Sequence, residues 1–183
     1  QQILRVDDEV TSDIDPAAAE QFSKYALPAI QDVDLVVLSD YAKGSLPLSL
    51  LEKIITHATA KGKMIIADPK RADISVYSGV DLLTPNLAEL QNTTDQILSS
   101  IEAIGQAATA LAKEFGIGSI LTTMSARGMM LSKADGTQFH DPASARDIFD
   151  VSGAGDTVVA MVAGALVALS LIHISEPTRR RGI

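Results

Sequence analysis

DLVVLSDYAKGSLPLSLLEKIITHATAKGKMIIADP, residues 34–69, contains two short apolar runs with a helix-like segment between them. The runs at 34–38 and 64–67 show no polar alternation, which is typical of strands covered on both faces. Between them, Pro47 predicts the start of a helix and Gly62 predicts its end. A strand, a helix and a strand at this spacing form a right-handed unit of a parallel sheet. The stretch therefore predicts an α/β fold.

The same alternation continues on both sides of this unit. The patterns predict helices at 16–30, from Asn86 onward and at 99–115, and strands at 80–83 and 119–122. Residues 128–132 and 137–140 predict a hairpin about Asp135-Gly136. A glycine-rich turn at 150–156 then leads into an apolar helix. We therefore expect a three-layer α/β/α domain with a mainly parallel sheet.

The composition is that of an acidic globular protein. Of 183 residues, 46% are hydrophobic and 21% are charged, and the formal net charge is −8. A negative field repels phosphates, so neither nucleic acid nor an anionic membrane is an expected partner. Any phosphate must be held by a local device, such as backbone N–H groups or a few placed cations. The chain has no cysteine, which excludes disulfides and thiolate metal sites and fits a cytoplasmic enzyme.

Both ends of the chain depart from the pattern of a complete gene product. The chain begins with Gln1 rather than Met, and residues 3–7 have the pattern of a strand already in progress. Residues 169–183 resemble the translation of a sequencing adapter, so we treat them as a non-native tail. Without that tail, the apolar run at 158–174 keeps about a dozen apolar residues, the length of a core helix rather than of a membrane span.

Polar residues follow the predicted strands. Because ligands of a parallel sheet bind outside the carboxyl ends of its strands, we expect the chemistry at this edge. The segments expected there are Ser39-Asp40, Asp68-Pro69-Lys70, Thr84-Pro85-Asn86 and Thr122-Thr123. Asp40, Lys43 and Lys70 are candidates for contact with a substrate or a phosphate group. The alternative is that Asp40 and Lys43 pair in a loop, and that Lys70 and Arg71 are solvated surface charges.

The stretch DVSGAGDT, residues 150–157, carries the strongest chemical signal. Two glycines and an alanine open a helix whose first N–H groups have no internal partner, and the helix dipole adds positive charge there. Small residues let an anion approach this backbone. Asp156 lies in the same turn and can accept a hydroxyl proton beside the bound anion. The alternative is that Asp156 only caps the helix; the stretch is neither a Walker A loop nor a dinucleotide fingerprint.

These residues also resemble a known family. The stretch at 150–157 resembles the second signature of the ribokinase-like (PfkB-type) carbohydrate kinases, although that signature usually has Thr where Ser152 stands. Four further segments occur in the same order and at similar spacing as in the members that phosphorylate D-glycero-D-manno-heptose 7-phosphate, some of which carry an adenylyltransferase as a second half. These segments are LSDYAKG at 38–44, DPK at 68–70, LTPNLAE at 83–89 and TMSARG at 123–128.

The resemblance implies a role for each of these segments. Asp156 would deprotonate the C1 hydroxyl of the sugar, in a pathway that builds the lipopolysaccharide core. The anion hole for the γ-phosphate of ATP would be Gly153, Ala154 and Gly155. Contacts with the nucleotide would come from Asn86, Leu87, Ala88, Glu89, Thr123, Ser125 and Gly128. Asn86 and Glu89 would also help to place Mg²⁺, indirectly, and Asp150 and Ser152 would lie near a monovalent cation.

The resemblance also implies an incomplete ribokinase-like domain, truncated at both ends. Residues 1–7 would end a lid strand, residues 8–168 would form a partial kinase domain, and residues 169–183 would be the tail. A homodimer through the lid is expected of the family, with a sugar phosphate and ATP as small-molecule partners. Because much of the sugar pocket would be missing, we expect the chain alone to be inactive and poorly stable.

Alternatives remain for the individual residues and for the function. Asn86 is a good helix cap, and Glu89, three residues later, would complete a capping box rather than touch a metal. The function could instead be that of another sugar kinase of the family. It could also be that of a non-catalytic nucleotide-binding module, in which Asp156 carries no chemistry.

Overall fold

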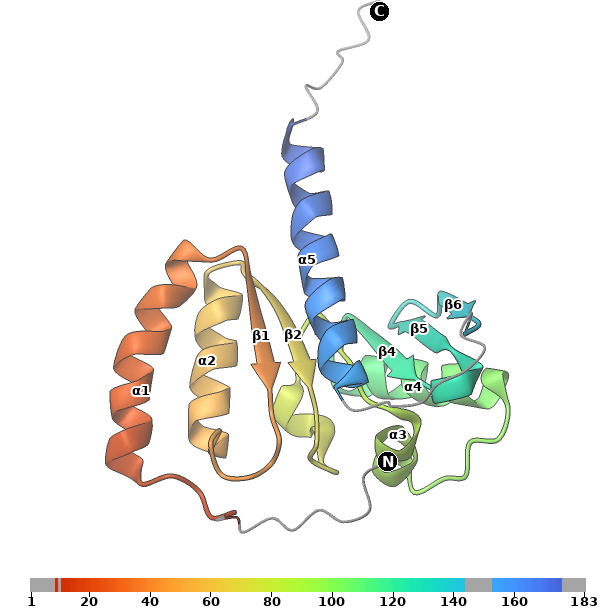
Figure 1. Cartoon of the computed structure of the whole chain (residues 1–183), viewed down its shortest axis with the longest axis horizontal. Helices are drawn as coiled ribbons and strands as arrows, with labels where there is room; N and C mark the ends of the chain where they lie inside the picture. Colours follow the sequence, from red (N-terminus) through yellow and green to blue (C-terminus); the bar gives the residue numbers. More distant parts are fainter. Residues whose placement is uncertain (1–8, 10, 144–152, 176–183) are drawn as a thin grey trace, which may run out of the picture.

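The protein was analysed as a computed structural model that describes residues 9, 11–143 and 153–175, with side chains described to residue 169. Six strands form one sheet in the order β1-β2-β3-β4-β5-β6 (Figure 1). The strands are β1 (Leu35–Ser39), β2 (Met64–Asp68), β3 (Leu82–Leu83), β4 (Ser119–Thr123), β5 (Met129–Lys133) and β6 (Gln138–Asp141). The strand expected at residues 3–7 lies outside the described residues.

The helices follow the sequence patterns closely. The α-helices are α1 (Pro16–Ala29), α2 (Leu48–Ala60), α3 (Leu87–Thr94), α4 (Ile101–Glu114) and α5 (Ala154–Ser175). The 3₁₀ turns are η1 (Ile30–Asp32), η2 (Ile74–Tyr77) and η3 (Ser125–Arg127). Side chains cap two of the helix starts: the Asp15 side chain accepts a hydrogen bond from the N–H of Ala17, and the Ser100 side chain accepts one from the N–H of Ala103.

The sheet is mainly parallel, as expected. Strands β1 to β4 pair in parallel, and β4, β5 and β6 pair antiparallel. The turn between β5 and β6 contains Asp135 and Gly136, as the hairpin pattern predicts. Strand β3 is shorter than the expected 80–83, because the N–H of Val80 bonds the carbonyl of Tyr77 in the preceding turn rather than a neighbouring strand.

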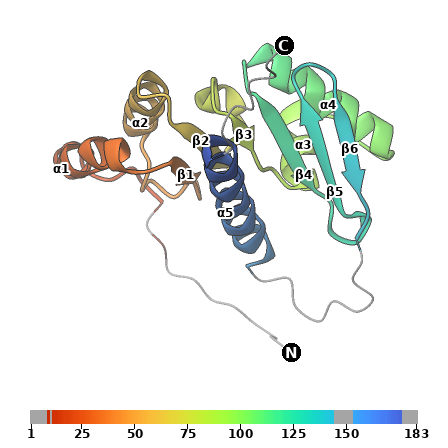
Figure 2. The ribbon, with the colours of Figure 1, turned by 90° about the horizontal axis from the view of Figure 1, so that it is seen from above.

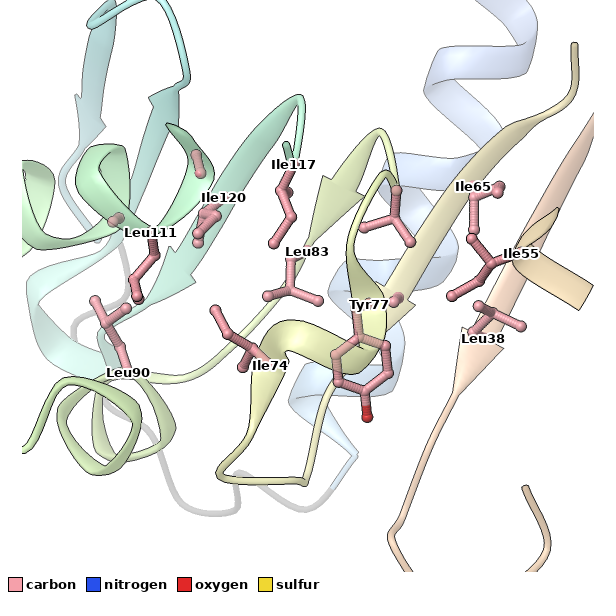
Figure 3. Packing of buried hydrophobic residues seen from close by; sticks show 14 of the residues in the cluster. Leu38, Ile55, Ile65, Ile74, Tyr77, Leu83, Leu90, Leu111, Ile117 and Ile120 are labelled. Carbon is pink, nitrogen blue, oxygen red and sulfur yellow. The ribbon is translucent and has the colours of Figure 1, made fainter. Parts of the chain in front are cut away.

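Each face of the sheet packs against different helices, which gives the three layers (Figure 2). Figure 3 shows the larger core, where side chains such as Leu38, Ile65 and Leu83 lie between the sheet and the helices on one face. On the other face, Ile66, Leu82 and Leu121 pack against α5 through Val159. Alternate residues of β2, Ile65 and Ile66, thus enter different cores because neighbouring side chains of a strand point to opposite faces.

Helix α5 runs from the carboxyl ends of the parallel strands past their amino ends. Figure 1 shows its first turn at the end toward which the arrowheads of β1 and β2 point. The helix continues through Ser175, beyond the boundary at 169 that the sequence suggests. Within the described residues, no helix is long and apolar enough to cross a membrane.

Candidate functional site

A cleft of about 910 Å³ lies at the carboxyl ends of β2, β3 and β4, beside the first turn of α5. Most of the residues that the sequence predicted for the site line this cleft. They are Lys70, residues 86–88, Thr123, Ser125, Gly128 and residues 153–156. The edge of the sheet therefore brings together segments that lie far apart in the sequence, such as Lys70 and Asp156.

The first turn of α5 presents both an open backbone and a carboxylate to this cleft. Gly153 has a φ of +74°, which favours glycine, and a Cβ added at Gly153 or Gly155 would meet no atom within 4 Å. The N–H of Thr157 bonds the carbonyl of Gly153, so the N–H groups of the three residues between them precede the first internal bond of the helix. Asp156 is exposed beside them rather than buried in the packing.

Tyr41, which the sequence analysis did not select, contacts Asp156 directly. Its hydroxyl donates to Oδ1 of Asp156 at 3.0 Å and to Oδ2 at 3.2 Å. The hydrogen bond to Asp156 and the charge of that carboxylate raise the pKa of Tyr41 above its ordinary value. The sequence carried two signals for Tyr41: it lies within the quoted segment LSDYAKG, and it comes one residue after the first polar residues that follow a strand.

Asp40 is buried beneath the cleft. Its side chain is 1% exposed, and its Oδ2 accepts from Nε of Arg71 at 2.6 Å and from the hydroxyl of Tyr77 at 2.7 Å. Burial raises the pKa of Asp40, but the hydrogen bonds from Arg71, Tyr77 and the N–H of Ala42 outweigh it, so the pKa lies below its usual value. Both oxygens of Asp40 thus accept hydrogen bonds within the protein, and the contact of Asp40 with a substrate stays a prediction.

The alternative pairing of Asp40 with Lys43 is absent. Lys43 forms an ion pair with Glu9 and does not line the cleft. Arg71, for which a surface charge was the alternative, instead donates from Nε to Asp40. A second nitrogen of Arg71 donates to the carbonyl of Leu46 at 2.7 Å. Through these contacts, Asp40 and Arg71 hold the loops after β1 and β2 together.

Lys70 lies between two carboxylates at the mouth of the cleft. Its Nζ is 2.9 Å from Oε1 of Glu89 and 3.4 Å from Oδ2 of Asp68. Burial lowers the pKa of Lys70, but Glu89 and Asp68 together raise it above its ordinary value. Burial raises the pKa of Asp68, and Lys70 and the hydroxyl of Thr84 offset only part of that effect. The lysine is therefore firmly charged and faces the cleft.

Asn86 and Glu89 form the capping box that the sequence left as an alternative. The N–H of Glu89 donates to Oδ1 of Asn86 at 2.9 Å, and the N–H of Asn86 donates to Oε2 of Glu89 at 2.8 Å. An ionised carboxylate has about four lone-pair positions, so Glu89 keeps acceptor capacity beyond the cap and Lys70. This capacity fits a water-mediated Mg²⁺ contact, although across residues 9, 11–143 and 153–175 no three acidic or histidine side chains gather closely enough to hold a metal themselves.

The loop from Thr123 to Gly128 forms another wall of the cleft. Ser125 has a φ of +51° and Gly128 a φ of +84°, and the N–H of Met124 bonds the carbonyl of Gly128 at 2.8 Å. A Cβ at Gly128 would approach the backbone oxygen of Asp141 to 1.9 Å, so the loop requires glycine there. The proposed cation ligands Asp150 and Ser152 lie outside the described residues.

The sequence matches a described family over nearly its whole length. The sequence model of the pfkB family carbohydrate kinases matches residues 2–175. The bifunctional protein HldE of Paramagnetospirillum magneticum is 42% identical over 168 residues, which are 92% of this chain and 34% of that protein. The bifunctional protein HldE of Shewanella sediminis is 40% identical over 172 residues, again with 34% of its length covered. The chain thus spans about a third of the length of these relatives.

Solved structures share the fold. Ribokinase of Arabidopsis thaliana, complexed with ribose and ATP, superposes with a TM-score of 0.67 at 23% identity and covers 78% of this chain and 46% of that one. Phosphofructokinase-2 of Escherichia coli, in complex with substrates and products, superposes with a TM-score of 0.69 at 16% identity and covers 85% of this chain and 51% of that one. At these identities the likeness extends to the fold alone.

Proposed function

This chain belongs to the pfkB family of carbohydrate kinases, and on that premise we propose that it phosphorylates the C1 hydroxyl of D-glycero-D-manno-heptose 7-phosphate. The single observation that carries the chemistry is the exposed carboxylate of Asp156 at the open first turn of α5, inside the cleft. The choice of a heptose is supported by the relatives named HldE at about 40% identity and by the segments quoted from the sequence.

The proposed roles follow from where charge develops in phosphoryl transfer. ATP supplies the γ-phosphoryl group when it is bound. The proposed anion hole of Gly153, Ala154 and Gly155, together with the dipole of α5, stabilises the negative charge on the transferring group. The carboxylate of Asp156 accepts the proton of the sugar hydroxyl as that oxygen attacks. Positioning and charge stabilisation are the main contributions that a protein makes to this reaction.

Residues along the nucleotide side of the cleft complete the proposed site. Lys70 is a fixed positive charge that faces the phosphates, and Asn86 and Glu89 would hold Mg²⁺ through water. The loop from Thr123 to Gly128 and residues 86–88 would contact the nucleotide. Asp150 and Ser152 remain candidates for a monovalent cation.

We further propose that the working enzyme is longer than this chain. The chain covers about a third of the HldE relatives and about half of the solved kinases, so the rest of the sugar pocket would come from other segments. In this proposal, residues 1–7 end a lid strand, residues 8–168 are a partial kinase domain, and residues 169–183 are a non-native tail. The enzyme would act in the cytoplasm and supply the lipopolysaccharide core, with a homodimer through the lid.

The test is an assay of ADP release by the full-length protein that carries this sequence, with and without Asp156→Asn. We expect turnover with heptose 7-phosphate that the substitution lowers by roughly 10³-fold or more, since loss of a group that acts within the transition state is costly. A higher kcat/KM for ribose or fructose 6-phosphate than for heptose 7-phosphate would indicate that the protein is another sugar kinase of the family. Nucleotide binding without turnover, unaffected by the substitution, would select a non-catalytic module. We expect no turnover from the 183-residue chain alone.

A further inference from the structure

We propose that Tyr41 is a positioning residue whose hydroxyl holds the Asp156 carboxylate in the orientation from which it accepts the proton of the sugar. The inference rests on the proposed role of Asp156 and adds a residue to which the sequence analysis gave no role. It starts from the two hydrogen bonds, at 3.0 Å and 3.2 Å, by which one hydroxyl spans both oxygens of the carboxylate.

These bonds join two elements that otherwise meet only through apolar packing. Tyr41 follows the carboxyl end of β1, whereas Asp156 lies in the first turn of α5. Within the described residues, no other side-chain hydrogen bond links α5 to the rest of the chain; the hydroxyl of Thr157 bonds within its own turn. The contact of Tyr41 therefore sets the position of the carboxylate relative to the sheet.

Tyr41 itself lies in a turn that is held by hydrogen bonds of Asp40. The preceding residue, Asp40, accepts from the N–H of Ala42 at 2.8 Å, and Ala42 has a φ of +54°. Asp40 is in turn fixed by Arg71 and Tyr77. A turn in which an aspartate bonds the backbone two residues ahead is a recognised local motif. The buried pair thus fixes the loop from which the hydroxyl of Tyr41 reaches the carboxylate.

The bonds leave the carboxylate free to act as a base. An ionised carboxylate has about four lone-pair positions, and Tyr41 occupies at most one on each oxygen of Asp156. The raised pKa of Tyr41 keeps its hydroxyl protonated, so the tyrosine donates a hydrogen bond and does not itself compete as a base. Because the single proton of the hydroxyl is shared between the two oxygens, lone pairs on both oxygens remain available to a sugar hydroxyl.

Another role is open to an exposed aromatic side chain. Tyr41 is 47% exposed and lines the cleft, so its ring could pack against a sugar and contribute only to binding. The two roles differ in kinetics. Loss of a ring contact that binds substrate and transition state equally raises KM, whereas loss of orientation of the base lowers kcat.

The test compares Tyr41→Phe with the wild type in the full-length kinase. Phenylalanine keeps the ring and removes the hydroxyl, so we expect kcat to fall roughly 10- to 100-fold, the range for a hydrogen bond to a charged group, with KM for the sugar changed less than about twofold. In an Asp156→Asn background the same substitution should have no further effect, because the positioned base is already absent. Tyr25→Phe, on the exposed face of α1, is the matched control and should leave both constants unchanged.

A second measurement does not depend on turnover. Hydrogen exchange of the amides at 157–160 should be faster in Tyr41→Phe than in the wild type, because the hydrogen bond between Tyr41 and the first turn of α5 is lost. Unchanged exchange, an unchanged kcat, or an equal loss in the Asp156→Asn background would each overturn the inference. Faster exchange in Tyr41→Phe, combined with a wild-type protein that transfers no phosphate to any sugar, would instead overturn the proposed function and leave Tyr41 as the residue that positions α5.

Discussion

Nε of Arg71 lies 2.6 Å from Oδ2 of Asp40, and this ion pair joins the loop after β2 to the loop after β1. Each partner is adjacent in sequence to a residue of the cleft: Asp40 precedes Tyr41, and Arg71 follows Lys70. The side chain of Asp40 is covered, whereas both neighbours reach the cleft. A buried pair therefore fixes the two loops that carry Tyr41 and Lys70 relative to each other.

Removal of the Asp40 carboxylate should destabilise the fold. Asp40→Ala would leave Arg71 and the hydroxyl of Tyr77 without their acceptor, and breaking a buried pair typically costs about 3–5 kcal/mol. The free energy of unfolding in urea should fall by that order. Glu20→Ala is the control, because Glu20 and Lys53 form an exposed pair and its loss should cost less than about 1 kcal/mol. Equal losses in the two variants would contradict the prediction.

The contribution of Asp40 should also depend on pH with a defined sign. Its pKa is lowered in the folded state, so its stabilisation is complete above the unfolded pKa of about 3.9 and is lost as pH falls through the folded value. The difference in unfolding free energy between wild type and Asp40→Asn should therefore be constant from pH 7 to about 5 and shrink below about pH 4. A difference that already shrinks between pH 7 and 5 would indicate a raised pKa and contradict the assignment.

Gly128 should tolerate no side chain. Its φ is +84°, and the Cβ of Gly128→Ala would lie 1.9 Å from the backbone oxygen of Asp141, so the loop after β4 must move. We expect a loss of stability of more than about 2 kcal/mol, since steric displacement adds to a backbone penalty of about 1 kcal/mol, and weaker binding of ATP to the full-length protein. Gly116→Ala is the control: φ is +63°, but no atom lies within 4 Å, so only the backbone penalty applies. Similar losses in the two variants would argue against the steric cause.

The sequence predicted the fold well because its signals are local and periodic. Helices α1, α2 and α4 fall within a few residues of their predicted bounds, because prolines mark two of the starts and glycines follow two of the ends. Helix α5 instead continues past the boundary at 169. The short β3 depends on a turn at Tyr77 whose hydrogen bond to Val80 leaves no trace in hydrophobic periodicity. A two-residue strand held between longer neighbours is set by the sheet rather than by its own residues.

The site was predicted less evenly, for a physical reason. Residues within one motif, such as Asn86 and Glu89 or Gly153 and Asp156, are close in sequence, so their proximity can be inferred. Contacts between loops cannot be inferred in this way, because the sequence does not record which rotamer Asp40 or Tyr41 adopts at the strand end. Asp40 turns inward to Arg71 while the next residue turns outward to Asp156. Neighbouring side chains of an extended segment point in opposite directions, which agrees with this arrangement. Which residues they meet depends on the tertiary structure.

Lys70 offers the sharpest test of charge in the cleft. Its ammonium group is kept ionised by Glu89 and Asp68, and it lines the cleft at the carboxyl end of β2. Two roles are consistent with this position. The lysine either neutralises two neighbouring carboxylates, which is a structural role, or also contacts a phosphate group during the reaction.

Lys70→Met keeps most of the apolar part of the side chain and removes the charge. If Lys70 meets a phosphate, kcat/KM for ATP should fall roughly 10- to 100-fold, the loss expected for one charge-assisted hydrogen bond, and Lys70→Arg should recover part of it. Lys61→Met, at the exposed end of α2 away from the cleft, is the control and should leave kcat/KM unchanged. A variant with normal kcat/KM but a lower urea midpoint would restrict Lys70 to the structural role, because two carboxylates without their shared cation repel each other whether or not a nucleotide is bound.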